Sequence, residues 1–282
     1  MRKALVIAPN WIGDALMAQP LFALLKARHP RLVIDALAPK WVAPVLARMP
    51  EIGKVFPSDL AHGKLQLSAR LMFAQQLKHE GYDVAYATNL DVHRNPTLLM
   101  SHRAFLSVGH DEYWSWNMRR HVEQARDRGV HLAFFSANTC YWQIRLAPSM
   151  QPGKADRIVI AYKSTAHAQD PVLLDLDSSN DQLATTKWRS PPVHQPEASL
   201  LGGMYLEGAI PFDGNLVIQS PTHWIMRNTG LHEGDQLPGL LGYEVDGDAQ
   251  SAPANRVVIA RSPVGQRMAT ATIYEASSGA IV

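Results

Sequence analysis

Residues 103–142 read RAFLSVGHDEYWSWNMRRHVEQARDRGVHLAFFSANTCYW, and this stretch decides the fold. Ala104–Val108 is a short apolar run closed by Gly109, which is typical of a strand buried on both faces of a parallel sheet. A helix follows, with Ser115 as N-cap and an end at Gly129, and its apolar face is marked by Met118, Val122 and Ala125. Because Val130–Ser136 is again strand-like, the stretch predicts a βαβ crossover.

Polar and aromatic side chains gather between the first strand and the helix, in the segment HDEYW at 110–114. Open α/β sheets bind their ligands where strands end, so this turn is the first candidate for a site. An alternative is structural: Tyr113 and Trp114 pack at a sheet edge, and the acidic residues cap the next helix.

The rest of the chain alternates in the same way. The N-terminal third predicts strands at Lys3–Ala8, Leu32–Ala38, Val55–Phe56 and Val84–Leu90, and helices at Ala15–His29, Trp41–Arg48 and Leu67–His79. Residues 155–282 contain short alternating runs separated by Pro, Gly, Asp and Asn, which predict β structure. We therefore expect an α/β fold, a doubly wound, mostly parallel sheet with a β-rich C-terminal extension.

Composition excludes several classes of protein. The 282 residues are 46% hydrophobic and 18% charged with a net charge of +2, and no Lys/Arg block indicates nucleic-acid binding. No run is long enough to span a membrane. The start, MRKALVIAPN, reaches Pro9–Asn10 too early for a signal peptide, so we expect a cytoplasmic protein. The single cysteine, Cys140, excludes an internal disulfide, and we interpret it as a buried or loop thiol.

Residues 1–86 resemble the lipopolysaccharide heptosyltransferases, through LVIAPNWIGDALMAQPLF, IDALAPKW and PVLARMPEIGKV. The resemblance implies glycosyl transfer from ADP-heptose, with Asp14 as the catalytic base in the first βα loop. A carboxylate there could take a proton from a sugar hydroxyl. Without the resemblance, Asp14 is better explained as a helix N-cap. The second, donor-binding domain of that family is not recognisable after residue 90.

Residues from Gly81 onward resemble the C-terminal part of the large (β) subunit of N,N-dimethylformamidase. HDEYWS, the PPVHQPE segment, THWIMRNTGL and GDQLPGLLGYEVD carry this resemblance. It implies a Rossmann-like, glutamine amidotransferase-like sheet and hydrolysis of a small amide. GYDVAY at 81–86 fits both families, so the chain is interpreted as a fusion of domains 1–86 and 87–282. The family's catalytic subunit works with a small partner subunit, and we expect either such a subunit or a homo-oligomer.

The second resemblance also implies a mononuclear ferric iron, Fe³⁺, held by two tyrosines and a glutamate. Tyr113 is the best match for one tyrosine and Glu197 for the glutamate, while the second tyrosine has no match. Oxygen ligands suit a hard ferric ion, which would act as a Lewis acid on the amide carbonyl. His110, Asp111 and Glu112 would then orient Tyr113.

Glu244 and His223 are the candidates for proton transfer, because each is a titratable residue inside an apolar run. His194 is a third candidate, three residues from Glu197. A buried structural role explains each of the three equally well. Asp91, His93 and Arg94 follow a predicted strand end and would line the same cleft, or Arg94 and Asp91 would form a local ion pair.

Three hypotheses follow from the sequence. The first is an amidohydrolase of the dimethylformamidase type, and the second is a heptosyltransferase. The third is a folded α/β protein without a working site.

Overall fold

The computed structural model describes residues 3–8, 15–16, 18–58, 79, 87–135, 137–150, 155–175, 177–208, 214–241 and 244–282. The chain divides into two compact units, Met1–Tyr86 and Ala87–Val282, and each is described by itself. Among the described residues, no helix combines the length and apolar character needed to cross a membrane.

The first unit contains a parallel sheet in the order β1–β2–β3. Its strands are β1 (Lys3–Ile7), β2 (Val33–Pro39) and β3 (Ile52–Ser58), joined by α2 (Gln19–Arg28) and α3 (Ala43–Leu46). Pro20 lies in the first turn of α2, where its missing N–H costs nothing. Phe22, Ile34 and Leu46 belong to one buried cluster, so this unit has its own core.

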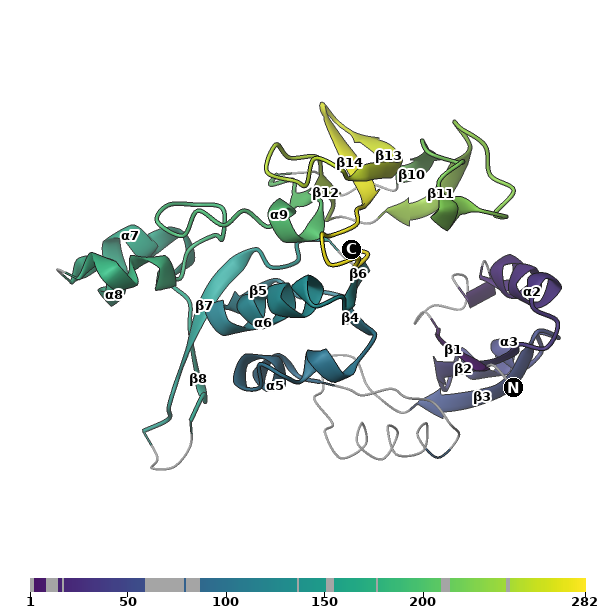
Figure 1. Ribbon diagram of the computed structural model, residues 1–282, viewed down its shortest axis with the longest axis horizontal. Coiled ribbons are helices and arrows are strands. Elements are labelled where there is room, and N and C mark those ends of the chain that lie inside the picture. The colour runs from purple at the N-terminus through teal and green to yellow at the C-terminus, as the bar shows by residue number, and fades with distance from the viewer. Residues whose placement is uncertain are drawn as a thin grey trace. The chain divides into compact units, whose positions relative to one another are not determined.

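The βαβ crossover predicted for residues 104–136 is confirmed in the second unit (Figure 1). β4 (Ala104–Val108) and β6 (His131–Phe135) pair in parallel, and α6 (Trp116–Asp127) connects them. The hydroxyl of Ser115 accepts a hydrogen bond from the Met118 N–H at 3.2 Å, as expected of an N-cap. The predicted apolar face of α6 is buried.

The strand β4 is not buried on both faces, which corrects the prediction. Leu106 is 50% exposed and Val108 is 61% exposed, whereas Ser107 between them is buried. In the described residues β4 and β6 form a sheet of only two strands, so the apolar run has a core on one side only.

The segment HDEYW is only partly a turn. Tyr113–Ser115 forms β5, which pairs in parallel with β7 (Trp142–Ala147), and β7 pairs antiparallel with β8 (Ile158–Ile160). Residues 110–112 therefore connect one small sheet to another.

The predicted strand Val84–Leu90 is wrong at its end, and residues 84–86 lie outside the described part. Asn89 begins α5 (Asn89–Arg94), because Thr88 and Asp91 form a reciprocal capping box. Asp91 and Arg94 are therefore helical, and Arg94 pairs with Asp156 at 2.7 Å instead of Asp91. The predicted helix Leu67–His79 lies outside the described residues except for His79.

The β-rich C-terminal region is confirmed as a six-stranded antiparallel sheet in the order β11–β10–β13–β14–β12–β9. Its strands are β9 (Met204–Tyr205), β10 (Gly214–Ile218), β11 (Gln236–Leu241), β12 (Asp246–Gly247), β13 (Val257–Val264) and β14 (Arg267–Ile273). Short helices complete the unit: η1 (Leu99–Ser101), η2 (Lys163–Thr165), α7 (Ala166–Gln169), α8 (Pro171–Leu174), η3 (Ser178–Leu183), α9 (Ala198–Leu201) and η4 (Trp224–Met226). The described fold is thus mixed α/β, with small parallel sheets in place of one continuous doubly wound sheet.

Candidate functional site

The turn at 110–112 is anchored by backbone hydrogen bonds to the segment that begins β7. The Asp111 carbonyl accepts the Cys140 N–H, and the Glu112 carbonyl accepts the N–H groups of Tyr141 and Trp142, each at 2.9 Å. The Asp111 side chain accepts from Ser107 at 2.9 Å. These bonds fix the direction in which His110 and Glu112 project.

His110 and Glu112 meet a glutamate from the C-terminal region. His110 Nε2 lies 3.1 Å from Glu244 Oε2 and 3.8 Å from Glu112 Oε2. Asn138 donates a hydrogen bond to each of two carboxylates. Its backbone N–H donates to Asp246 Oδ1 at 2.8 Å, and its side-chain amide donates to Glu244 Oε1 at 3.3 Å. We call Glu112, Glu244 and Asp246 the carboxylate cluster.

Tyr205 of β9 lies next to the carboxylate cluster, since it pairs with Asp246 of β12 across the sheet. Burial raises the pKa of the Tyr205 phenol, and the nearby carboxylates raise it further, with Glu244 first and Glu112 next. Burial likewise raises the pKa of Asp246 to about 7, against the hydrogen bond from Asn138. Negative charge is therefore concentrated around this phenol.

Tyr113 faces a different set of side chains. Its hydroxyl oxygen accepts a hydrogen bond from Lys163 Nζ at 2.5 Å. The same ammonium lies 4.6 Å from the Tyr113 ring centroid and 5.4 Å from that of Trp142. Lys163 has a positive φ of 58°. A cation thus covers both the oxygen and the ring of the predicted metal ligand.

Glu197 is 1% exposed and is held by Arg189. Arg189 Nε lies 3.1 Å from both carboxylate oxygens, and Nη2 is 3.1 Å from Oε1. Burial raises the pKa of Glu197 above its ordinary value, and the guanidinium opposes the rise. Arg189 also covers the Tyr141 ring at 5.1 Å, next to Lys187, which pairs with Glu207 at 2.6 Å.

A comparison with known proteins assigns the family. The family described as N,N-dimethylformamidase beta subunit-like, C-terminal, matches residues 36–282. The chain belongs to this family. The match begins well before Gly81, so the family resemblance extends further toward the N-terminus than the sequence motifs indicated.

The heptosyltransferase resemblance is also confirmed, over a smaller part of the chain. Lipopolysaccharide heptosyltransferase 2 of Escherichia coli K12 is 44% identical over 84 residues, which cover 30% of this chain and 24% of that protein. Lipooligosaccharide heptosyltransferase 2 of Haemophilus ducreyi is 40% identical over 83 residues. The chain spans about a quarter of the length of these relatives. The solved structure of E. coli ADP-heptose lps heptosyltransferase II is 35% identical and covers 33% of this chain and 26% of its own, with a TM-score of 0.26, too low to indicate a shared overall fold.

Of the site residues predicted for this family member, Glu244 meets the HDEYW segment, through His110. Tyr113 and Glu197 each contact a cation of their own, and no described contact joins them. In the part of the chain that the structure covers, no three His, Cys, Asp or Glu side chains are grouped to hold a metal ion.

The remaining candidates have other surroundings. His223 caps η4, with its Nδ1 accepting from the Ile225 N–H at 3.4 Å and its ring against Trp224. His194 is exposed, and Asp14 lies outside the described residues. Cys140 is fully buried, which raises the pKa of its thiol far above the ordinary range and makes it unreactive.

Sequence reasoning missed Asp246, Tyr205 and Asn138. Asp246 had a usable signal, because it lies two residues after Glu244, and extended backbone directs side chains two apart to the same side. Tyr205 and Asn138 had none, since only the pairing of β9 with β12 and the turn before β7 bring them to the cluster.

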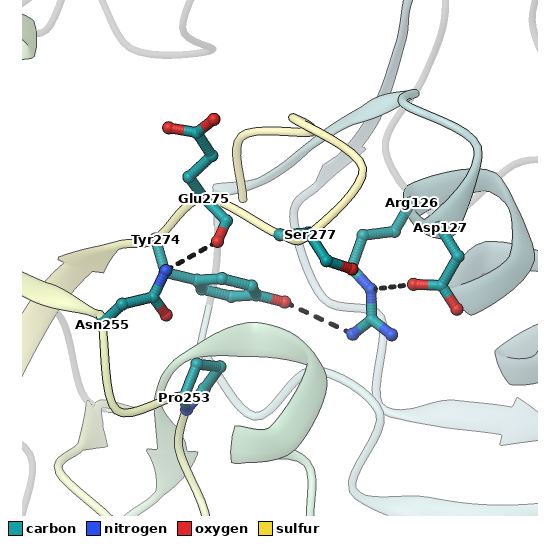
Figure 2. Close-up of a pocket in the computed structure, with 8 residues that line it drawn as sticks. Arg126, Asp127, Pro253, Asn255, Tyr274, Glu275 and Ser277 are labelled. Carbon is teal, nitrogen blue, oxygen red and sulfur yellow. Dashed lines mark hydrogen bonds and ion pairs between the residues drawn. The ribbon is translucent and has the colours of Figure 1, made fainter.

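An open cavity of about 660 Å³ lies elsewhere in the second unit, between the end of α6 and the turns at 253–255 and 274–277 (Figure 2). Arg126 donates to Asp127 at 2.8 Å and to the Tyr274 hydroxyl at 3.5 Å, and Tyr274 donates to the Leu200 carbonyl. The polar groups at its centre are therefore already bonded to one another, and none belongs to the carboxylate cluster.

Proposed function

We propose that the second unit is an amide hydrolase of the N,N-dimethylformamidase type, acting on a small amide. The observation that supports the proposal is the 3.1 Å approach of His110 Nε2 to Glu244 Oε2, within a chain that belongs to this family. It places a titratable pair at the mouth of the βαβ unit, with His110 46% exposed toward solvent.

Glu244 is the general base of this proposal. Its carboxylate takes a proton from a water molecule, whose oxygen bonds to the amide carbonyl carbon. The C–N bond then breaks, and the proton held by Glu244 passes to the leaving nitrogen. His110 positions the glutamate. We give this role to His110 instead of His223, because the ring of His223 caps η4.

A mononuclear ferric iron is part of the proposal, with Tyr113 and Glu197 as its ligands. Both are oxygen donors, which suit ferric iron. Iron would have to displace the cations that now bond to these oxygens, Lys163 at Tyr113 and Arg189 at Glu197. The bound ion would supply Lewis acidity toward the carbonyl. Two protein ligands hold a metal less tightly than three, so we expect iron to dissociate readily in a chelator.

The test of hydrolysis is release of dimethylamine from N,N-dimethylformamide by the purified full chain with added iron. Glu244→Gln should lower kcat by about 100-fold or more, because it removes the base and keeps the side-chain shape. Glu275→Gln, at an exposed carboxylate, is the matched control and should retain activity. Equal activity of Glu244→Gln and the unsubstituted chain would contradict the mechanism.

The iron is tested separately by elemental analysis and visible absorption. A tyrosinate-to-iron charge-transfer band should appear on reconstitution and disappear in Tyr113→Phe. An iron-loaded protein without such a band would remove Tyr113 from the ligand set.

A second candidate function rests on the 44% identity to lipopolysaccharide heptosyltransferase 2. In this alternative the first unit binds ADP-heptose, and Asp14 is the base. Calorimetric titration with ADP-heptose tests it, because no heat of binding would exclude a donor site.

Three finer features belong to the same proposal: a cytoplasmic location, a glutamine amidotransferase-like origin of the α/β region, and association with a small partner subunit or a second copy. Light scattering of the purified chain, alone and with a candidate subunit, tests the association.

A further inference from the structure

Two buried oxygen atoms at the carboxylate cluster lack a hydrogen bond. Asn138 is 3% exposed, and its Oδ1 has no hydrogen-bond partner. Glu244 Oε2 has none either, since His110 Nε2 lies 3.1 Å away without hydrogen-bond geometry. The two groups touch through the 3.3 Å bond from Asn138 Nδ2 to Glu244 Oε1. Buried acceptors are nearly always bonded, so these neighbouring atoms indicate a missing donor.

The charge around this point indicates that the donor is positive. Glu112, Glu244 and Asp246 all act on the Tyr205 phenol. Nearby cations are engaged elsewhere, since Lys187 pairs with Glu207 and Arg189 with Glu197. Arg189 also acts on Asp246 from its pairing with Glu197, and the ring of His110 lies 3.1 Å from Glu244 and 3.8 Å from Glu112.

The missing donor is better explained by an N–H cation than by a metal. No three His, Cys, Asp or Glu side chains of the described residues have the grouping that a metal ion needs. An ammonium ion donates hydrogen bonds to separate acceptors without a fixed coordination geometry. It would satisfy an amide oxygen and a carboxylate oxygen together.

We propose that the carboxylate cluster, with Asn138 and Tyr205, binds a small organic ammonium ion. The proposal rests on the proposed function, because amide hydrolysis releases an amine that is protonated at neutral pH. The cluster is then the position taken by the amine half of the substrate after the C–N bond breaks. At the edge of the cluster, the side chains of His110 and Glu244 are 46% and 23% exposed.

The experiment is calorimetric titration of the full chain with dimethylammonium chloride at pH 8, with potassium chloride keeping the ionic strength constant. We expect saturable binding with one site per chain. Glu112→Gln should weaken it about tenfold, because the carboxylate charge is lost and the shape is kept. Glu275→Gln is the matched control at an exposed carboxylate and should bind as the unsubstituted chain does.

The proposal is overturned if dimethylammonium gives no more heat than potassium chloride, or if Glu112→Gln and Glu275→Gln bind it equally. Circular dichroism of each variant shows that a loss of binding is not a loss of fold. The measurement needs neither iron nor turnover. Binding without hydrolysis would contradict the proposed function alone, and hydrolysis without binding would contradict this inference alone.

Discussion

At the scale of single residues, the site depends on carboxylates that the fold places close together. Asp246 lies across the sheet from Tyr205 and is bonded to the Asn138 backbone, and Glu244 reaches Asn138 and His110. Burial disfavours the charged form of a carboxyl group, and neighbouring negative charges add to this effect. The pKa of Asp246 is raised by its burial first, and Glu197 and Glu244 add to the rise.

This raised pKa predicts a pH dependence of stability. The pKa of Asp246 is about 7 in the folded protein, above its ordinary value, so between about pH 4 and 7 the folded chain keeps a proton that the unfolded chain has released. The free energy of unfolding should therefore fall as pH rises through this range. A shift of about three units corresponds to ~4 kcal/mol for a fully buried group, and we expect about half of this for the half-buried Asp246.

Asp246→Asn should remove the part of this pH dependence that Asp246 causes. Urea unfolding at pH 5 and pH 8 measures the free energy of unfolding at each pH, and the difference between the two free energies should be smaller in the variant. The groups that also face Asp246 are Asn138, Glu197, Arg189, Glu244 and Tyr205, and all remain in the variant. An unchanged difference would show that another group titrates.

At the scale of elements, helix caps and apolar patterns within one stretch of sequence predicted the βαβ unit correctly. The cap at Ser115, the buried face of α6 and the parallel pairing of β4 with β6 all followed from residues within one stretch. The burial of β4 did not, because it depends on how many strands join the sheet. The start of α5 was missed because the Thr88–Asp91 capping box overrides an apolar run.

The cap at Ser115 gives a prediction for the element as a whole. Its hydroxyl bonds the Met118 N–H and lies 2.6 Å from His93 Nδ1, so it joins α6 to α5. Ser115→Ala should lower the free energy of unfolding by ~1–2 kcal/mol. Chemical denaturation measures the loss, and Ser251→Ala at an exposed turn is the matched control, expected within ~0.5 kcal/mol of the unsubstituted chain.

At the scale of the whole molecule, the candidate site is assembled from segments that no local pattern connects. The HDEYW segment, the turn before β7, β9 and the residues around β12 each contribute one or two side chains. Sequence reasoning found the first of these and Glu244. The positions of Asp246, Tyr205 and Asn138 depend on pairing between segments far apart in the sequence, which no local pattern of residues predicts.

Each unit is stabilised by a core of its own, so we expect the two units to unfold independently. Phe22 is 1% exposed in the cluster of the first unit, whereas Val122 is fully buried in that of the second. Phe22→Ala should destabilise the first unit by ~3–5 kcal/mol through the cavity that it leaves. Hydrogen exchange read by mass spectrometry should then accelerate in peptides from residues 18–58 and remain unchanged in those from 104–135. Val122→Ala should give the opposite pattern. Faster exchange in both regions after either substitution would mean that the two units unfold together as one cooperative body. Having separate cores would then not give the units separate free energies of unfolding.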